Sequence, residues 1–568
     1  MPTGFPSQNR DLRRARLGGG FALAGWVILA AQACAQQTAP AAAPVEGTAA
    51  WRPQIHFYAP PNWINDPNGP ILLNGQYHLF FQLNPFGDQW GHMSWGHAVS
   101  PDLVHWKQLP VALPEENGVM IFSGSTVEDR DNTSGLCGDA GSKTPGCLAA
   151  LYAGNSAEKQ TQNLAISRDG GLTWTKYSGN PVLDLGLKDF RDPKVFWHGP
   201  SESWVMVVAL PDQHKVRFYR SKNLRQWEQA SEFGPAGGIG GVWECPDLMK
   251  LPVREPAGKH DAMGKTVSSR WVLNVNVNPG GPAGGSGDQY FVGQFDGFRF
   301  TEDHPGSGPH WADRGKDFYA STSFANLPAG QDPLWIGWMS NWEYAGKLPS
   351  LPGRGVMTVA RRLYLRQPEG RPDPVSVQEP LLLVQRPFLP VPDRRPSQAL
   401  FGAAPYRSIA QVNRQIAEGR LSGSVYLLRF TLDPGDAAES GVRLRRSAPG
   451  PNNTAAEETV VGIDRNTGQI FVDRTRSGQS GWAPGFPARV SAPLKHPQAS
   501  SISLEIVVDR SSVEVFAEDG ETVLTNLIYP SATSQGLAFY ATATPPGAGP
   551  ALVRSVEFIP LDQGSAAR

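Results

Sequence analysis

The chain has little net charge, and it lacks long basic runs and repeated apolar segments. The formal net charge of its 568 residues is −1, which argues against nucleic acid as the main partner. Its one long apolar run, residues 17–31, is too short to span a bilayer comfortably and is not followed by another. Helical periodicity is scarce between residues 51 and 367, where short apolar runs alternate with turns. These absences favour a protein built from strands, with no stable membrane span.

The residue clusters that usually hold metal ions are also missing. No histidines and cysteines occur together at ligand spacing, and no acidic loop is of the calcium-binding type. His92 and His97 flank Trp95, and we expect them to be hydrogen-bonded structural residues. The sequence therefore predicts no metal site.

The first 35 residues have the parts of a secretory signal. Arginines precede the apolar run, and Ala33-Cys34-Ala35 offers a small-residue cleavage site. We expect residues 1–35 to be removed near Ala35 and the protein to be secreted or periplasmic. The pair Arg13-Arg14 also allows twin-arginine export, and lipidation at Cys34 stays open.

Cysteine is scarce, and three cysteines remain after such a cleavage. Cys137 and Cys147 lie in one Gly-rich stretch, so an oxidising compartment favours a disulfide between them. Cys245 is left over. A small buried apolar role is favoured for it over a catalytic thiol.

Three short motifs place a carboxylate shortly before a proline and beside an aromatic residue. They are Trp63-Ile-Asn-Asp-Pro-Asn-Gly69, Phe190-Arg-Asp-Pro193 and Trp243-Glu-Cys-Pro246. Pro67 restricts the backbone of Asp66, which favours a carboxylate held at the end of a strand. Any one motif alone would also fit a surface turn. Three of them suggest one site that contains Asp66, Asp192 and Glu244.

A loose internal repeat gives these motifs equivalent positions. Ser100-Pro-Asp-Leu-Val-His-Trp106 resembles the segments that end at Trp174 and Trp227, and residues 295–300 are a weaker copy. Each tryptophan is followed, 17 or 18 positions later, by a polar motif: Ser123, Asp192 and Glu244 respectively. The repeat predicts a β-propeller over residues 51–367, with five blades of roughly 60 residues. The first strand of each blade would line a central channel, where Asp66 also belongs.

Composition divides the rest of the chain. Residues 36–50 are rich in Ala, Gln and Pro and are expected to form a linker, and residues 368–396, rich in Pro and Arg, a connector. Residues 397–562 contain short alternating strands, which predict a β-sandwich, and residues 563–568 form a tail. The expected strands of the sandwich include 425–432, 442–446, 469–474, 504–508, 512–517, 537–541 and 553–559. The predicted fold is all-β: a five-bladed propeller followed by a C-terminal β-sandwich.

Three converging acids suit glycoside hydrolysis. Two carboxylates must flank the scissile bond, one ionised to attack the anomeric carbon and one protonated to help the leaving group depart. A third can hold substrate hydroxyls. A metal site is the rival use of three acids, and the missing ligand clusters disfavour it.

So many motifs in this order resemble glycoside hydrolase family 32, the β-fructosidases, and most of all its exo-acting inulinases and levanases. The resemblance covers about residues 55–362, and residues 504–530 resemble the family's C-terminal sandwich. It implies Asp66 as nucleophile, Glu244 as general acid/base and Asp192 as transition-state stabiliser, in a retaining mechanism without metal or organic cofactor. Matching positions imply substrate contacts from Asn65, Gln82, Trp90, Phe122, Ser123, Arg191 and Trp338.

One departure from the family pattern is Asp288, which stands where the family usually has Thr. It lies in the segment 284–293, and the change could alter substrate preference at the pocket rim or be neutral.

The resemblance implies a secreted hydrolase that removes terminal β-D-fructofuranosyl units from fructans such as inulin and levan, and from sucrose. A fructosyltransferase would share the same acids, and an invertase would take sucrose as its main substrate. A carbohydrate-binding protein without activity is a third class, which the presence of all three acids disfavours. The expected partner is therefore a fructan or sucrose.

Overall fold

The structure is a computed structural model that describes residues 48–139, 143, 145–255, 264–367, 380–389, 398–399, 405–448, 456–544 and 546–561. The predicted signal with its cleavage site near Ala35 lies outside the described residues, as do Cys34, most of the linker and the tail. Within the described residues, no helix is long and apolar enough to cross a membrane. All of them belong to one compact unit.

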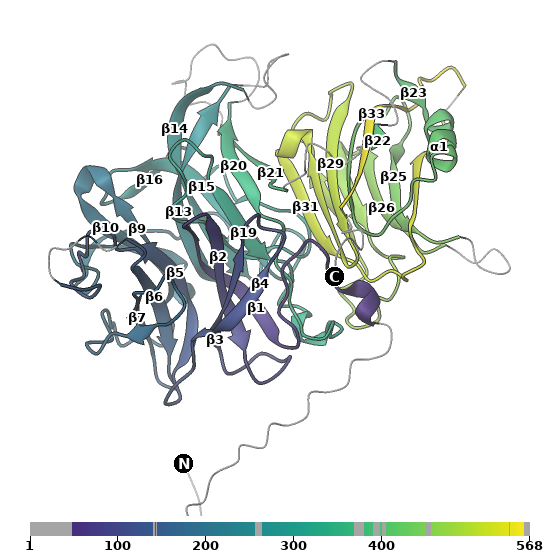
Figure 1. Ribbon diagram of the computed structural model, residues 1–568. Coiled ribbons are helices and arrows are strands. Elements are labelled where there is room, and N and C mark those ends of the chain that lie inside the picture. Colours follow the sequence, from purple (N-terminus) through teal and green to yellow (C-terminus); the bar gives the residue numbers. More distant parts are fainter. Residues whose placement is uncertain are drawn as a thin grey trace, which may run out of the picture. The chain divides into compact units, whose positions relative to one another are not determined.

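The first part of the chain folds into three successive four-stranded antiparallel sheets (Figure 1). In each sheet every strand pairs with the next one along the chain, as expected where short apolar runs alternate with tight turns. The strands are β1 (Trp63–Leu73), β2 (Gln76–Asn84), β3 (Ser94–Ser100), β4 (Lys107–Leu113), β5 (Met120–Glu128), β6 (Leu148–Asn155), β7 (Gln160–Ser167), β8 (Thr175–Lys176), β9 (Arg191–His198), β10 (Ser203–Leu210), β11 (Lys215–Ser221) and β12 (Glu228–Phe233).

A nine-stranded sheet follows, in the order β16-β15-β14-β13-β20-β19-β18, with β17 on β15 and β21 on β20. Its two halves are joined by a short parallel pairing of β13 with β20. The strands are β13 (Val242–Arg254), β14 (Thr266–Asn278), β15 (Gly287–Phe295), β16 (Phe300–Glu302), β17 (His310–Trp311), β18 (Tyr319–Ser323), β19 (Leu334–Trp338), β20 (Arg361–Arg366) and β21 (Leu382–Pro387). Strand β21 lies inside the segment expected to be a connector. It pairs with β20 along its whole length, so the connector segment contains a strand.

The internal repeat corresponds to one recurring turn. Nε1 of each repeat tryptophan, Trp106, Trp174 and Trp227, donates to the carbonyl oxygen three residues earlier at 3.0 Å. Each tryptophan directly precedes the fourth strand of its sheet. In the weaker copy, Asp296 accepts hydrogen bonds from the N–H groups of Phe298 and Arg299. The repeat therefore marks the point at which each sheet is completed.

Five strands contact one another in cyclic order. Strand β1 contacts β5, β5 contacts β9, β9 contacts β13, β13 contacts β18, and β18 contacts β1. Each of them has a register shift in its pairing with the next strand of its own sheet, and these shifts fall at residues 64–67, 121–124, 191–194, 244–247 and 319–322. Such β-bulges bend a strand and redirect its side chains. The bulged segments contain Asp66, Ser123, Asp192, Cys245 and Ala320.

A glycine allows two of these strands to approach each other. Gly69 on β1 has φ +43°, and a Cβ there would meet Oγ1 of Thr126 on β5 at 2.2 Å. Only a residue without a side chain fits this crossing.

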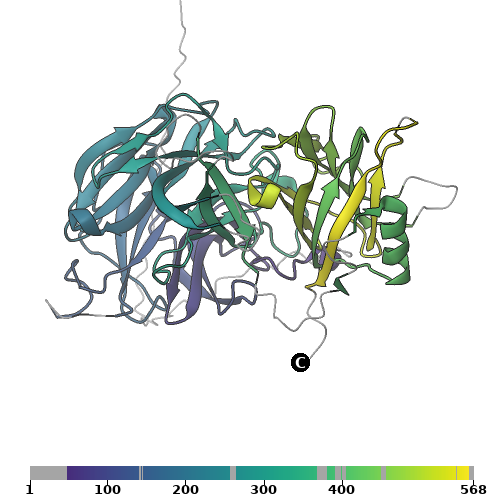
Figure 2. The same ribbon diagram turned by 90° about the horizontal axis from the view of Figure 1, so that it is seen from above.

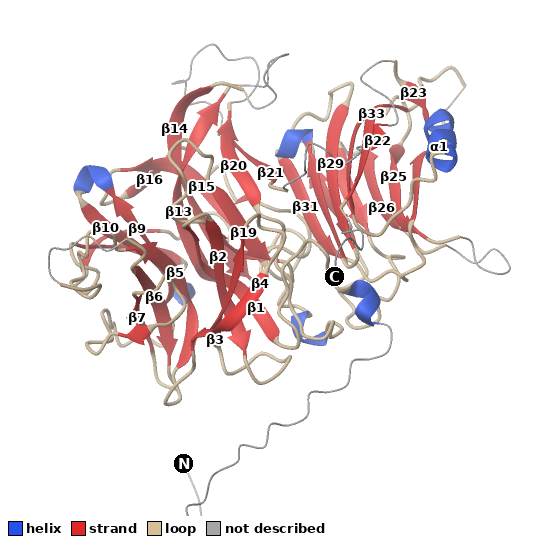
Figure 3. Cartoon of the chain, in the orientation of Figure 1, coloured by secondary structure: helices blue, strands red, loops and turns tan. Residues whose placement is uncertain are grey.

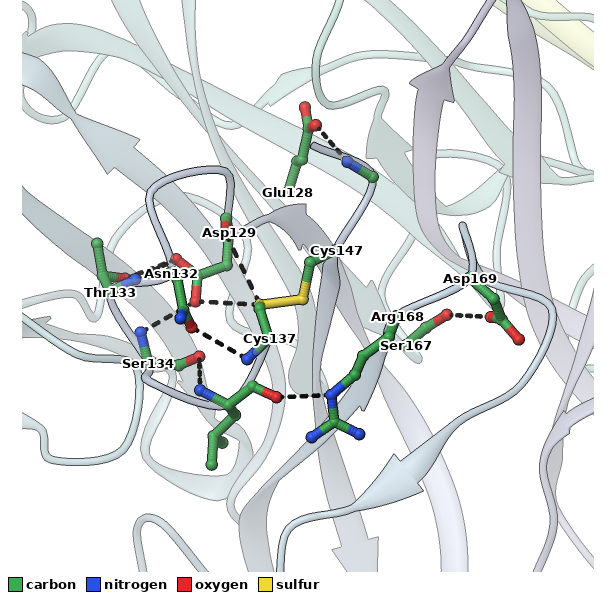
Figure 4. Close-up of a disulfide and its surroundings, with 12 residues drawn as sticks. Glu128, Asp129, Asn132, Thr133, Ser134, Cys137, Cys147, Ser167, Arg168 and Asp169 are labelled. Carbon is green, nitrogen blue, oxygen red and sulfur yellow. Dashed lines mark hydrogen bonds between the residues drawn. A yellow bond between two sulfur atoms is a disulfide. The ribbon is translucent and has the colours of Figure 1, made fainter. Parts of the chain in front are cut away.

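The loop closed by the disulfide Cys137–Cys147 follows the C-terminal end of β5. Cys137 and Cys147 are bonded to each other, and Asp129 organises the loop by accepting hydrogen bonds from Thr133 and Ser134 (Figure 4). Both cysteines are buried in an apolar cluster between β6 and β10.

The C-terminal part builds two antiparallel sheets around one apolar core (Figure 2). One has the order β22-β33-β24-β29-β30-β31, with β23 on β33, and the other β28-β27-β26-β25-β32. The strands are β22 (Gln398–Ala399), β23 (Arg407–Ser408), β24 (Tyr426–Asp433), β25 (Glu439–Arg446), β26 (Thr459–Asp464), β27 (Gln469–Asp473), β28 (Arg489–Pro493), β29 (Ile502–Asp509), β30 (Ser512–Ala517), β31 (Thr522–Leu527), β32 (Gly536–Ala541) and β33 (Leu552–Pro560).

One α-helix occurs among the described residues, α1 (Ile409–Glu418), at the edge of these sheets (Figure 3). Its N-cap is Ser408, which forms a capping box with Gln411. The helix buries Val412 and Ile416 against the core. Short 3-10 turns occur at Thr48–Trp51, Gly199–Ser201, Pro211–Gln213, Ala345–Lys347 and Glu518–Gly520.

Candidate active site

The bulged ends of the central strands surround a cavity of about 370 Å³. Three predicted acids, Asp66 from β1, Asp192 from β9 and Glu244 from β13, line it together. The other lining residues are Asn65, Gln82, Trp90, Met93, Phe122, Ser123, Arg191, Val242, Asn278 and Trp342. Residues that are far apart in the sequence thus form one site, and its volume is in the range of small-molecule pockets.

Asp66 accepts hydrogen bonds from Ser123 and Asn65. Ser123 Oγ donates to Asp66 Oδ2 at 2.6 Å, and Asn65 Nδ2 donates to Oδ1 at 3.0 Å. Trp63 Nε1 fixes the Asn65 amide in turn, at 2.8 Å. Burial raises the pKa of Asp66, as does the charge of Glu244, while the bonds from Ser123 and Asn65 oppose the rise. The carboxylate is therefore aligned, although its surroundings disfavour the charge.

Glu244 bridges a cation and a phenol. Arg191 donates to Glu244 Oε1 from Nη2 at 3.0 Å and from Nε at 3.2 Å. Tyr319 Oη donates to Glu244 Oε2 at 2.5 Å. Asp189 anchors the guanidinium of Arg191 at 2.7 Å. Burial raises the pKa of Tyr319 well above its ordinary value, and Glu244 adds to the rise, so the phenol keeps its proton and acts as a donor.

Asp192 on β9 and Cys245 on β13 both have strained backbone, and a hydrogen bond joins them. Asp192 has φ +66° and Cys245 has φ +45°, both in the left-handed region that non-glycine residues rarely adopt. The N–H of Cys245 donates to Asp192 Oδ2 at 2.9 Å. Burial raises the pKa of Asp192 to about 7, with Arg191 opposing and the charges of Glu244 and Asp66 adding to the rise.

The Cys245 side chain points at Asp66. Its Sγ lies 3.6 Å from Asp66 Oδ2, and burial among three acids raises the pKa of this thiol well above its ordinary value. A protonated thiol of this kind serves as a weak donor and is a poor nucleophile. Cys245 therefore has polar contacts in the site, beyond the apolar role expected from the sequence.

The walls of the cavity are aromatic and amide side chains. Trp90 is 48% exposed and stands edge-on to Phe122, with ring centroids 6.3 Å apart. Gln82 is buried, and its Nε2 has no partner among the described residues. An unpaired buried donor at a cavity wall is suited to a ligand hydroxyl.

Trp338 is the exception among the predicted contact residues. It is fully buried, does not line the cavity, and packs against Trp342 and Trp63 with centroid distances of 4.9 and 6.1 Å. Trp342 faces the cavity in its place. The sequence could not distinguish them, because several tryptophans follow one another in this segment.

Asp288 does not lie at the pocket rim, one of the two possibilities that its sequence position left open. It is 0% exposed on β15 and does not belong to the cavity lining. Tyr319 is a site residue that the sequence did not reveal, since no proline follows the acid near it, Asp317, and Tyr319 carries no carboxylate itself. Its only signal is its place on a strand near the Trp-rich segment.

The arrangement can perform acid–base and nucleophilic chemistry on one bond. Asp66 is oriented by donors, as a nucleophilic carboxylate must be, and Glu244 is held by different partners across the cavity. Two carboxyl groups in unlike environments can divide the roles of nucleophile and proton donor. Asp192 and Arg191 add polar groups that suit the hydroxyls of a sugar.

Comparison with known proteins identifies the family of the chain. The profile of the Glycosyl hydrolases family 32 N-terminal domain matches residues 56–374, and that of the Glycosyl hydrolases family 32 C terminal matches residues 399–558. A levanase of Bacillus subtilis (strain 168) is 44% identical over 498 residues, which cover 86% of this chain and 68% of the relative. An extracellular exo-inulinase of Aspergillus awamori is 40% identical over 522 residues, covering 85% and 90%.

A solved structure has the same overall fold. The β-fructofuranosidase from Schwanniomyces occidentalis, complexed with fructosyl-erythritol, superimposes with a TM-score of 0.73 at 31% identity, covering 90% of this chain and 98% of that one. Because both profiles together span most of the described residues, the chain belongs to glycosyl hydrolases family 32.

Proposed function

We propose that this glycoside hydrolase is a secreted, retaining exo-β-fructosidase. It releases terminal β-D-fructofuranosyl units from fructans of the inulin and levan type, and from sucrose. The observation that carries the proposal is the convergence of Asp66, Asp192 and Glu244 on one cavity of about 370 Å³. The names of the levanase and exo-inulinase relatives support the choice of substrate.

The three acids have distinct roles in the proposed reaction. Asp66 attacks the anomeric carbon and forms a fructosyl-enzyme, while Glu244 protonates the departing oxygen. Glu244 then takes a proton from the water that releases fructose. Asp192 and Arg191 hold the fructosyl hydroxyls as positive charge develops on the ring. Ser123 and Asn65 keep the Asp66 carboxylate aligned for attack.

The remaining predicted contacts complete the subsite. Gln82 offers its unpaired Nε2 to a hydroxyl, and Trp90 and Phe122 supply apolar surface for the sugar. Trp342 takes the place expected of Trp338.

We propose the five-bladed propeller for residues 51–367 and the β-sandwich for residues 397–562. Support for five blades comes from the cyclic contacts of β1, β5, β9, β13 and β18, each of which begins a four-strand meander or its equivalent. The nine-stranded sheet then holds the fourth and fifth blades, bridged by the short parallel pairing of β13 with β20. Two sheets with one shared core support the sandwich. Secretion rests on the signal expected in residues 1–35, and it fits the extracellular relative.

A product time course on inulin, levan and sucrose tests the function. Exo-hydrolysis yields fructose as the sole product released from fructans at the earliest times. Early oligosaccharides would contradict it in favour of endo-cleavage, and products longer than the substrate would point to a fructosyltransferase. A preference for sucrose over both polymers would define an invertase, and no turnover of any of the three would overturn the proposal.

A further inference from the structure

A buried polar cluster lies behind the wall of the active site, formed by Asn274 on β14, Asp288 on β15 and Ser321 on β18. All three residues are 0% exposed. Ser321 Oγ donates to Asp288 Oδ2 at 2.6 Å and accepts from Asn274 Nδ2 at 3.1 Å. Two oxygens, Asp288 Oδ1 and Asn274 Oδ1, have no partner among the described residues. The cluster therefore contains two buried acceptors and is short of a donor.

Among the described residues, no lysine, arginine or histidine forms an ion pair with Asp288. Charged and titratable groups on the strands and loops around it have other partners: Asp313 pairs with Arg361, Asp247 with Lys194, Lys316 with Glu343, Tyr319 with Glu244, and His310 with Ser307. A buried carboxylate without a cation is costly. Burial raises the pKa of Asp288 to about 7, with Ser321 and Asn274 opposing the rise and Asp313 adding to it.

The cluster holds a segment of β18 that the pairing with β19 leaves free. The pairing of β18 with β19 is interrupted between Tyr319 and Thr322, and Ala320 has φ +53°. Side chains of the neighbouring half of the sheet fix this segment instead. Asn276 Oδ1 accepts from the N–H of Ala320 at 2.7 Å, and the Ser321 hydroxyl is bound by Asp288. Next to them, Tyr319 reaches Glu244.

We propose that Asp288 acts as a neutral carboxylic acid which donates the missing hydrogen bond in this cluster, and that it thereby positions Tyr319 against Glu244. Asp288 touches neither the cavity nor the substrate, so it is a positioning residue. With the proton on Asp288 Oδ1, that oxygen becomes a donor, and Asn274 Oδ1 is the acceptor that lacks one. Loss of the proton would leave both oxygens without a donor and place a negative charge in the buried cluster. The Ser321 segment of β18 would then shift away from Asp288.

The sign of the pH effect follows from the direction of the shift. In the unfolded chain Asp288 ionises near its ordinary pKa of 3.8, whereas in the folded protein it keeps its proton up to about pH 7. The folded state therefore loses stability relative to the unfolded chain as pH rises from about 4 to about 7, and the effect is complete above that range. The Tyr319–Glu244 contact weakens over the upper part of the same range.

The variant Asp288→Asn tests the proposal, because an amide supplies a donor and an acceptor in the same shape but cannot ionise. The melting temperature of the native protein should fall between pH 4 and pH 7 by several degrees more than that of the variant. A second measurement, turnover of sucrose, rests on the proposed function. As pH rises, kcat should fall more steeply in the native protein than in the variant, with KM unchanged. Asp212→Asn, which removes an exposed carboxylate, should behave as the native protein does.

Identical pH profiles of melting temperature for native protein and Asp288→Asn would overturn the proposal. This readout needs no substrate, so it is separate from a failure of the proposed function. If Asp288→Asn does not fold, infrared difference spectra of native protein against Asp288→Ser replace it. A protonated carboxyl band that is present at pH 5 in the native protein alone supports the proposal, and its absence refutes it.

Discussion

At the scale of single residues, the hydrogen bonds around Asp66 govern the pH at which the site can work. A nucleophilic carboxylate must be ionised, so activity is lost as pH falls through its pKa. Burial raises that pKa and the Ser123 hydroxyl lowers it. We predict that Ser123→Ala moves the acid limb of kcat/KM to higher pH. A bond to a charged group contributes about 1.5–3 kcal/mol, so activity below the optimum should fall roughly ten- to a hundredfold.

The pH profile between pH 3 and pH 8 measures this effect. Ser125→Ala is the matched control, because Ser125 lies on the same strand and its buried hydroxyl bonds to Pro193 O rather than to Asp66. Loss of activity by the same factor at every pH in Ser123→Ala would contradict the proposed link to Asp66 ionisation.

Tyr319 should matter through Glu244. The variant Tyr319→Phe removes the 2.5 Å bond to Oε2 and leaves Glu244 with Arg191 alone. We expect kcat on sucrose to fall about ten- to a hundredfold, since one hydrogen bond to a charged group is lost. An activated aryl fructoside needs little help from a proton donor, so its turnover should fall less.

A control for general effects of a lost phenol is Tyr344→Phe. Tyr344 is equally buried, but its hydroxyl donates to Asp317, away from the cavity. That variant should lose stability without changing the ratio of rates on the two substrates. An unchanged ratio in Tyr319→Phe would remove Tyr319 from proton transfer.

Sequence alone could indicate the acids but not all of their partners. Asp66, Asp192 and Glu244 stand in motifs with prolines and aromatic residues, which mark unusual backbone. Tyr319 and Trp342 stand in no acid–proline motif, and their positions depend on how β18 and the segment after β19 pass the cavity. The segment 284–293 suggested a place at the pocket rim for Asp288, yet β15 is buried at all but one of its positions, Asp288 included.

At the scale of elements, the repeat predicted where each sheet ends, but it did not predict the irregularities within the strands. Trp106, Trp174 and Trp227 make one local hydrogen bond each, which a short motif can encode. The five bulges depend on pairing with a neighbouring strand, and a single sequence does not report the register. Strand β31 was also missed. Its polar residues, such as Thr525 and Asn526, are buried because they contact the segment around Asp313.

The disulfide loop should contribute stability and not catalysis. Cys137 and Cys147 close a loop with a sequence separation of 10, at the end of β5 opposite to Ser123. We predict that Cys137→Ser with Cys147→Ser lowers the free energy of unfolding by about 2–3 kcal/mol and leaves kcat unchanged. Urea denaturation measures the loss, with native protein in a reductant as the control. Free thiols at both positions in exported protein, found by mass spectrometry, would show that the bond does not form.

At the scale of the whole molecule, buried charges tie the C-terminal sheets to the rest of the chain. Arg361 on β20 binds Glu514 at 2.6 Å, and Arg474 binds Asp317 at 2.6 Å, with all four side chains at 0% exposure. Removing one partner of a buried pair leaves an unpaired buried charge, which is strongly destabilising. The two parts matched by separate family profiles therefore depend on each other for stability.

His56 is the titratable member of this interface. Its Nδ1 lies 2.8 Å from Asp509 and its Nε2 lies 2.8 Å from Glu514, both on C-terminal strands. Burial lowers the pKa of His56, but the bonds and charges of Asp509 and Glu514 outweigh it and raise the pKa to about 9. Because this pKa lies above the ordinary 6.5, the stabilisation is fully present below pH 6.5 and is lost as pH rises through 9.

We predict that His56→Gln lowers the free energy of unfolding by about 3–5 kcal/mol below pH 6.5, the usual loss when a buried pair is broken. The difference in free energy of unfolding between native protein and variant should narrow as pH approaches 9, because His56 of the native protein then loses its positive charge. Urea denaturation at several pH values measures both curves. His105→Gln is the control, since His105 also pairs with a carboxylate, that of Asp102, but is 47% exposed. Parallel curves for native protein and His56→Gln would mean that His56 is neutral in the folded state and that the interface relies on its arginine pairs alone.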